Sequence, residues 1–179
     1  MRKINYISSN KKKYEEARYI AKRFDIALVC VDLKLKEIQS INQKEISLET
    51  AKQAFKILKE PLIVDDAGLY LSGYPNFPGS FTKFMLDSLG RESLFKLIMP
   101  PHSAVWKCFA TYIDESRIYT AAGDLHGLIG KIPSLKNYSY DDIFLVDNKK
   151  MSLMTIKEKS EISHRSKAFS KIFNMLSKE

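Results

Sequence analysis

Apolar and polar positions along the chain follow two different periods, and together they predict an α/β fold. Short apolar runs between polar residues are typical of strands, whereas apolar residues three or four positions apart are typical of helices. The two kinds of segment alternate over the first third of the chain, so we expect a sheet that helices cover on both faces. Strands are predicted over residues 3–9, 25–33 and 61–64, with helices over residues 10–24 and 45–58.

The pattern changes in the second half of the chain. Residues 70–80 hold two prolines and two glycines, which predicts a loop. The two long alternating stretches that follow are typical of an antiparallel strand pair. The elements expected here are strands over residues 103–114, 117–130 and 143–146, short helices near 80–89 and 91–98, and an amphipathic helix over 163–176.

Charge and length narrow the function classes. The 179 residues include 29 Lys and Arg against 21 Asp and Glu, a net charge of +8. Such an excess favours an anionic partner, either nucleic acid or a polyphosphate, although a solvated lysine-rich surface explains it equally well.

No run of eighteen apolar residues is present, so we expect no membrane association and a cytoplasmic location. Residues 1–179 fit one domain with two lobes, and Cys30 and Cys108 are expected as reduced core residues.

Three lysines stand in the first turn of the first predicted helix. Asn10 before them is a natural N-cap residue. Lys11, Lys12 and Lys13 add positive charge where the helix dipole is already positive, so they cost stability unless an anion offsets them. Backbone N–H groups at a helix start are also good phosphate donors. A phosphate-binding turn is one interpretation, and three solvated lysines are the other.

Carboxylates follow two of the predicted strands. Asp65 and Asp66 are expected beyond the carboxyl end of strand 61–64, where α/β folds bind ligands. Adjacent side chains in extended backbone point to opposite faces, so only one of the two should face a site. Glu37 follows the preceding strand, and such acids can hold magnesium or orient a water molecule. Taken alone, the Asp-Asp-Ala-Gly segment is equally well explained as the opening of a turn.

His164 and Arg165 begin the last predicted helix, again with positive charge at its N-terminal end. The planar fork of Arg165 suits a phosphate, or a carbonyl oxygen and ring nitrogen of a base. A histidine beside a helix cap also has an ordinary structural explanation.

These segments resemble, in order and over nearly the whole chain, those of the inosine triphosphate pyrophosphatase family, which acts on ITP, XTP and dITP. SSNKKKYEEA resembles its N-terminal Thr-Gly-Asn-x-x-Lys signature, LKEIQS the segment with its metal-binding glutamate, and VDDAGLYL its acidic motif. NFPGSFTKFML, GDLHGLIG, YSYDDIF and EKSEISHRSKA are similar to its Pro-Gly segment, its glycine-containing strand, its base-recognition loop and its Ile-Ser-His-Arg ending.

The resemblance implies a role for each matching residue. Asp66 would be catalytic and would hold Mg²⁺ together with Glu37. The fold would be an elongated mixed twisted sheet flanked by helices, with two lobes around a central substrate cleft. A homodimer is also implied, with Tyr74 and Phe77 of the loop exposed for the interface. The implied substrate-binding residues are Ser8, Ser9, Asn10, Lys11, Lys12, Lys13, Ala67, Lys83, Tyr138, Ser139, Tyr140, Asp141, Lys159, His164 and Arg165.

Departures from the family pattern leave the preferred base open. Ser9 replaces a glycine of the first motif, and Ala67 replaces a Ser or Thr whose hydroxyl would reach the phosphates. Ser139 and Asp142 replace a glycine and a proline of the base loop. The lysine expected in the second helix has no clean match, and Lys52 is merely nearby.

The expected reaction is hydrolysis of a non-standard purine nucleoside triphosphate to the monophosphate and pyrophosphate. Donors aimed at the purine 6-position would donate hydrogen bonds to an oxo group there and would repel the amino group of adenine. The alternatives are a basic nucleic-acid-binding module that has lost catalysis and a pyrophosphatase with shifted base specificity. The scattered lysines and the carboxylates favour an enzyme with no stable nucleic-acid partner.

Overall fold

The computed structural model describes residues 2–130 and 140–178. Its strands are β1 (Arg2–Ile7), β2 (Ile26–Val31), β3 (Leu62–Leu71), β4 (Pro78–Gly79), β5 (His102–Ile113), β6 (Ile118–Ile129), β7 (Phe144–Val146) and β8 (Lys149–Lys150). Its helices are α1 (Lys11–Lys22), α2 (Gln43–Leu58), α3 (Thr82–Ile98), α4 (Ile156–Ile162) and α5 (His164–Leu176), with 3-10 turns η1 (Tyr140–Asp142) and η2 (Met151–Leu153).

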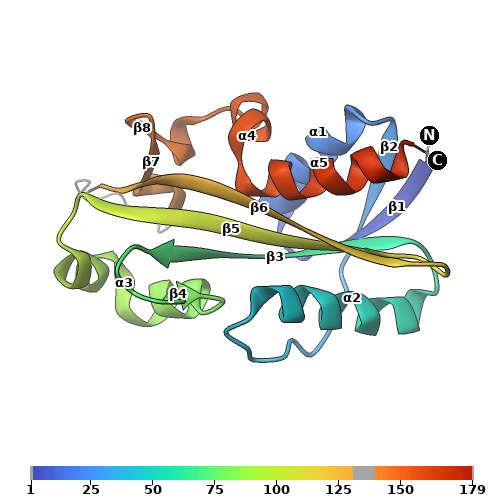
Figure 1. The fold of residues 1–179 in the computed structure, drawn as a ribbon, viewed down its shortest axis with the longest axis horizontal. Helices are drawn as coiled ribbons and strands as arrows, with labels where there is room; N and C mark the ends of the chain where they lie inside the picture. Colours follow the sequence, from blue (N-terminus) through green and yellow to red (C-terminus); the bar gives the residue numbers. More distant parts are fainter. Residues whose placement is uncertain (1, 131–139, 179) are drawn as a thin grey trace.

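These strands form one mixed sheet in the order β2-β1-β3-β5-β6-β7-β8, with β4 paired to β3. β1 is parallel to β2 and β3, and the remaining pairings are antiparallel. Helices α1, α4 and α5 lie over one face and α2 over the other, and α3 lies beside β3 and β4 at the far end of the sheet (Figure 1). The open mixed sheet between two helical layers confirms the predicted fold class, and β5 and β6 are the predicted long antiparallel pair.

The apolar core is divided between the two faces and the two ends of this sheet. Tyr6 and Ile20 pack with Phe169 and Phe173 of α5 in one cluster, and a smaller cluster fills the space under α2. A third cluster lies at the other end of the sheet, where α3 and β5 to β7 enclose Trp106. β1 is buried over its last four residues because helices cover both of its faces.

Strand β3 is longer than the sequence predicts. It continues to Leu71, so Asp65 and Asp66 lie within the strand, opposite Ala110 and Phe109 of β5. The expectation that these acids follow a strand end was therefore wrong. β1 pairs with β3 only at residues 62 and 63, and the rest of β3 is held by a partner some forty residues away in sequence, which local patterning does not reveal. The predicted loop 70–80 is shortened in the same way by the pairing of β3 with β4.

Other expectations have mixed outcomes. Gly90, with φ of 69°, kinks α3 and divides it into the two predicted short helices. Cys108 is buried as expected, whereas Cys30 is exposed, so its prediction as a core residue was wrong. No helix among residues 2–130 and 140–178 combines the length and the apolar character that crossing a membrane requires.

Candidate active site

The loop after β1 and the first turn of α1 form a positively charged corner. Asn10 caps the helix, because its Oδ1 accepts hydrogen bonds from the backbone N–H groups of Lys12 at 3.0 Å and Lys13 at 3.2 Å. The first turn contains no acid. The cap confirms the predicted helix start, and it also occupies two of the amides that were expected to face a phosphate. The groups that this corner exposes to solvent are those of Ser9, Asn10, Lys11 and Lys12, with Ser8 and Lys13 half-buried.

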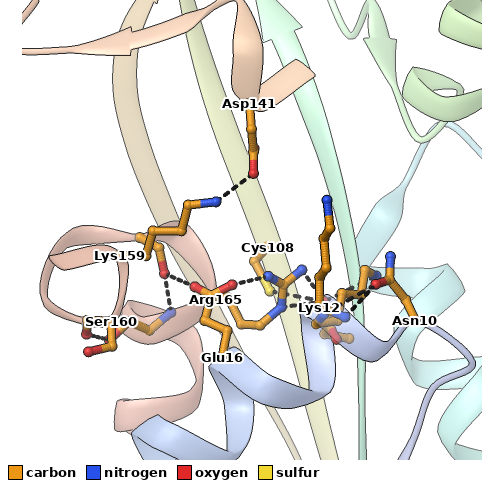
Figure 2. A network of polar contacts seen from close by, with 12 residues as sticks. Asn10, Lys12, Glu16, Cys108, Asp141, Lys159, Ser160 and Arg165 are labelled. Carbon is orange, nitrogen blue, oxygen red and sulfur yellow. Dashed lines mark hydrogen bonds and ion pairs between the residues drawn. The ribbon is translucent and has the colours of Figure 1, made fainter. Parts of the chain in front are cut away.

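Asp65 lies at the centre of a buried polar network beneath this corner. Arg165 donates from Nε and Nη2 to its Oδ2, both at 3.2 Å, and Lys13 Nζ lies 3.4 Å from the same oxygen. The hydroxyl of Tyr6 donates to the other carboxylate oxygen. Arg165 Nη1 also donates to Glu16 Oε2 at 2.6 Å (Figure 2). The network joins β1, α1, β3 and α5 at one point.

The charges in this network stabilise each other. Burial alone would raise the pKa of Asp65, but Lys13 and Arg165 outweigh it and hold that pKa well below the usual range. Burial likewise opposes the charge of Arg165, and the carboxylates of Asp65 and Glu16 raise its pKa. Asp65 is therefore ionised throughout the physiological range and serves as a counter-ion. The predicted base contact of Arg165 remains a prediction, because its guanidinium is engaged by these two acids.

Asp66 faces the opposite side of the sheet and has a different environment. Its Oδ2 accepts a hydrogen bond from Gln43 Nε2 of α2 at 3.0 Å. Burial raises the pKa of Asp66 to about 6, against the opposing charge of Lys13. The two neighbouring acids thus diverge, as the sequence predicts. A carboxyl group that gains and loses its proton near neutral pH is suited to general-base chemistry.

Glu37 and Asp66 are the carboxylates that could hold a metal ion. Glu37 is exposed in the irregular segment 32–40, and its negative charge contributes to the raised pKa of Asp66. The described part of the chain contains no group of three or more His, Cys, Asp or Glu side chains arranged around a metal position. Mg²⁺ is commonly held by only one or two carboxylates, with phosphate oxygens and water completing its shell. The pair therefore fits that ion in the presence of a polyphosphate.

A buried aromatic cluster surrounds His164. Its ring stacks on Trp106 with 5.2 Å between centroids and 13° between planes, and Tyr140 meets Trp106 edge-on at 5.8 Å. His164 Nδ1, Trp106 Nε1 and the Tyr140 hydroxyl have no hydrogen-bond partner within the described ranges. Burial, with the nearby charge of Arg165, lowers the pKa of His164, so its imidazole is neutral at physiological pH. Unpaired polar atoms on a buried aromatic surface suit a planar polar ligand.

Other predicted site residues lie around this cluster or away from it. Lys159 Nζ and Asp141 Oδ2 form an ion pair at 2.6 Å (Figure 2). Ala67 follows the two acids in β3 and is half-buried, and Lys83 of α3 is exposed. Tyr138 and Ser139 lie outside the described residues.

Two surface hollows lie elsewhere on the molecule. One, of about 280 Å³, is lined by residues from Val146 to Ile162, and another, of about 300 Å³, lies beside Asp114. Neither includes Asp66 or His164 among its lining residues, so the central cleft remains a prediction. Lys52, the nearest match to the expected helix lysine, pairs with Glu49 at 2.6 Å.

Sequence reasoning missed Glu16, Gln43, Tyr70 and Trp106. Glu16 has a detectable signal, because it is three positions after Lys13 and four before Ile20 on the helix face that proves buried. The other three gain their role from partners on distant segments, and nothing in their local sequence marks them.

Comparison with known proteins places the chain in a family. Residues 4–175 match the Ham1 family. The chain belongs to the Ham1 family. It is 35% identical to a dITP/XTP pyrophosphatase of Saccharolobus solfataricus, covering 97% of this chain and 93% of that protein. It is 31% identical to a dITP/XTP pyrophosphatase of Methanopyrus kandleri, covering 93% of this chain and 92% of that protein.

Solved structures support the same fold. The HAM1 protein of Coxiella burnetii superposes with a TM-score of 0.80 at 22% identity, and each chain is covered completely at 100%. At that identity the likeness concerns the fold alone.

Proposed function

We propose that this Ham1-family protein is a nucleoside-triphosphate pyrophosphatase that removes non-standard purine nucleotides from the nucleotide pool. ITP, dITP and XTP would be hydrolysed to the monophosphate and pyrophosphate. The names of relatives that match nearly the whole chain support this proposal. The structural observation that carries it is the difference between two adjacent acids. Asp65 has a lowered pKa and is a counter-ion, whereas burial raises the pKa of Asp66 to about 6.

The chain's own groups supply the steps of this reaction. Asp66 accepts a proton from the attacking water, and its Oδ1 is the oxygen that does not accept from Gln43. Lys13 and the exposed Lys11 and Lys12 offset negative charge on the phosphates and the leaving pyrophosphate. Glu37 and Asp66 would hold Mg²⁺, which when bound neutralises phosphate charge and polarises the phosphoryl group.

Base selection is assigned to the cluster around His164. A neutral imidazole can satisfy the oxo groups of hypoxanthine or xanthine, together with the donors of Trp106 and Tyr140, which have no partner among residues 2–130 and 140–178. The amino group of adenine brings donors toward donors and loses those hydrogen bonds. We therefore expect kcat/KM for ITP or XTP to exceed that for ATP at least about a hundredfold.

A panel of triphosphates, assayed for pyrophosphate release with and without Mg²⁺, tests this function. The proposal requires rapid Mg²⁺-dependent turnover of ITP, dITP or XTP. Equal turnover of ATP and ITP would contradict the base selection, and a different preferred base would establish the shifted-specificity alternative. Absence of turnover together with tight binding of single-stranded DNA would favour the nucleic-acid module.

We also propose that the protein is a cytoplasmic homodimer. Phe77, Phe81, Phe84 and Leu89 are exposed on α3 and the segment before it, and apolar side chains of this kind are common in interfaces. Tyr74, expected to be exposed, is half-buried, because its hydroxyl donates to the backbone oxygen of Leu97 at 3.0 Å. A cytoplasmic location agrees with a substrate drawn from the nucleotide pool.

A further inference from the structure

Asp66 is tied to the rest of the fold through a short chain of side-chain hydrogen bonds. Gln43 Nε2 donates to Asp66 Oδ2 at 3.0 Å, and the hydroxyl of Tyr70 donates to Gln43 Oε1 at 2.7 Å. Lys107 Nζ lies over the Tyr70 ring, 5.0 Å from its centroid. Gln43 belongs to α2, Tyr70 to β3 and Lys107 to β5, so three elements support the carboxylate of Asp66.

The chain of hydrogen bonds has only one workable direction when Asp66 is ionised. A carboxylate accepts and does not donate, so the amide nitrogen of Gln43 must face Asp66. The amide oxygen of Gln43 then faces Tyr70, whose hydroxyl must donate. Tyr70 therefore fixes which way the Gln43 amide lies, and that amide in turn fixes the carboxylate oxygen that accepts from it.

The backbone is shaped so that Gln43 can reach this position. Gln43 is the first residue of α2 and is 1% exposed, so its amide has no access to water as an alternative partner. A Cβ on Gly68 would lie 2.5 Å from Gln43 Nε2 and 2.2 Å from the backbone oxygen of Gly79. Only a glycine at this point of β3 leaves room for the amide beside the strand.

We propose that Gln43 and Tyr70 are positioning residues for Asp66, holding one carboxylate oxygen so that the other faces the reacting groups. Gln43 acts on the carboxylate directly, and Tyr70 acts through Gln43. The inference rests on the proposed function for its kinetic consequence and on the hydrogen bonds alone for its structural consequence. Buried amides left without a partner are costly, so the arrangement is defined sharply in the folded protein.

Three variants test the proposal by steady-state kinetics with ITP and Mg²⁺. Gln43→Met removes the amide nitrogen and oxygen at similar volume, and Tyr70→Phe removes one hydroxyl. We expect kcat to fall about 30-fold and about fivefold respectively, with KM within about threefold, because small displacements of a reacting group are costly. In the double variant Tyr70→Phe should add nothing to Gln43→Met, since the hydrogen bonds join Tyr70 to Asp66 through Gln43.

Tyr112→Phe is the matched control. Its hydroxyl donates to Asp114 Oδ2 at 2.8 Å beside the turn between β5 and β6, away from Asp66. Its removal should lower thermal stability as much as Tyr70→Phe does, with kcat unchanged. Additive losses in the double variant, or a kcat of Gln43→Met within twofold of the parent, would overturn the proposal.

A crystal structure of Tyr70→Phe gives a readout that does not depend on turnover. We expect the Gln43 amide to lose its fixed orientation and Asp66 to adopt a second rotamer. An unchanged single rotamer of Asp66 would overturn the proposal even if the parent protein proved inactive on ITP. Failure of the proposed function would show instead as an inactive parent in which the variant still alters Asp66.

Discussion

Replacing each of the adjacent acids by asparagine should change stability in opposite directions and lower activity to very different extents. Asp66→Asn removes the proposed general base, so kcat at saturating Mg²⁺ should fall by at least about 10³. Asp65→Asn leaves that base in place, and its effect on kcat should be clearly smaller. The order reverses for folding, because Asp65 lies in an ion network and Asp66 is a buried acid with a raised pKa.

The magnitudes follow from the environments of the two carboxylates. The side chain of Asp65 is 1% exposed and neutralises Arg165, which would keep Glu16 as a carboxylate partner. Breaking a buried ion pair on one side costs about 3 kcal/mol or more of unfolding free energy. The pKa of Asp66 rises from 3.8 to about 6. At about 1.4 kcal/mol per pKa unit, a neutral asparagine side chain in place of Asp66 should stabilise the metal-free protein by roughly 1–3 kcal/mol at pH 8.

Thermal unfolding without Mg²⁺ at pH 8 measures both effects. We expect the Tm of Asp65→Asn to fall by roughly 6–12 °C and that of Asp66→Asn to rise by roughly 2–12 °C. In the parent, the share of stability due to neutral Asp66 should be lost as pH rises from about 4 to about 6, since the unfolded chain ionises first. The share due to ionised Asp65 should be lost as pH falls below about 4. The reasoning is refuted if Asp65→Asn proves the more damaging change to kcat, or if Asp66→Asn melts well below the parent.

Three further predictions concern the aromatic cluster around His164 and the oligomeric state of the protein. Trp106 is the one tryptophan of the sequence and stacks on His164, so IMP binding should change its fluorescence; constant emission at saturating IMP would place the base elsewhere. Light scattering at micromolar concentration should give about twice the chain mass of 20.6 kDa, and a monomer would contradict the proposed dimer. Gly123→Ala would put a Cβ 2.2 Å from the backbone oxygen of His164 and so displace the start of α5. KM for ITP should therefore rise more than kcat falls. A larger effect on kcat than on KM would show that α5 does not contribute to base binding.

Elements defined by local signals could be predicted from the sequence. Asn10 predicts a helix start because its side chain caps neighbouring amides, and the structure places it there. The paired strands β5 and β6 are joined by a short turn, so their alternation alone is sufficient. The acids of β3 show the limit of this reasoning, since the strand continues only because β5 returns beside it.

The candidate site could likewise be predicted only in part from the sequence. The residues Lys13, Asp66 and His164 could be nominated because residue type and motif position mark them. Their surroundings could not be predicted, because each depends on segments far away in the sequence. Glu16 meets Arg165 across 149 positions, and Gln43 meets Asp66 across 23.

The pair Asp65-Asp66 shows why residue types do not determine chemistry by themselves. In extended backbone the two side chains must point to opposite faces, so one meets α1 and α5 and the other meets α2. Two cations against Asp65 lower its pKa, whereas Asp66 receives one neutral amide donor, and burial raises its pKa. The same residue type therefore serves as a counter-ion on one face and is poised as a base on the other. A sequence shows that two acids are adjacent, but the helices that cover each face decide which of them can take a proton at neutral pH.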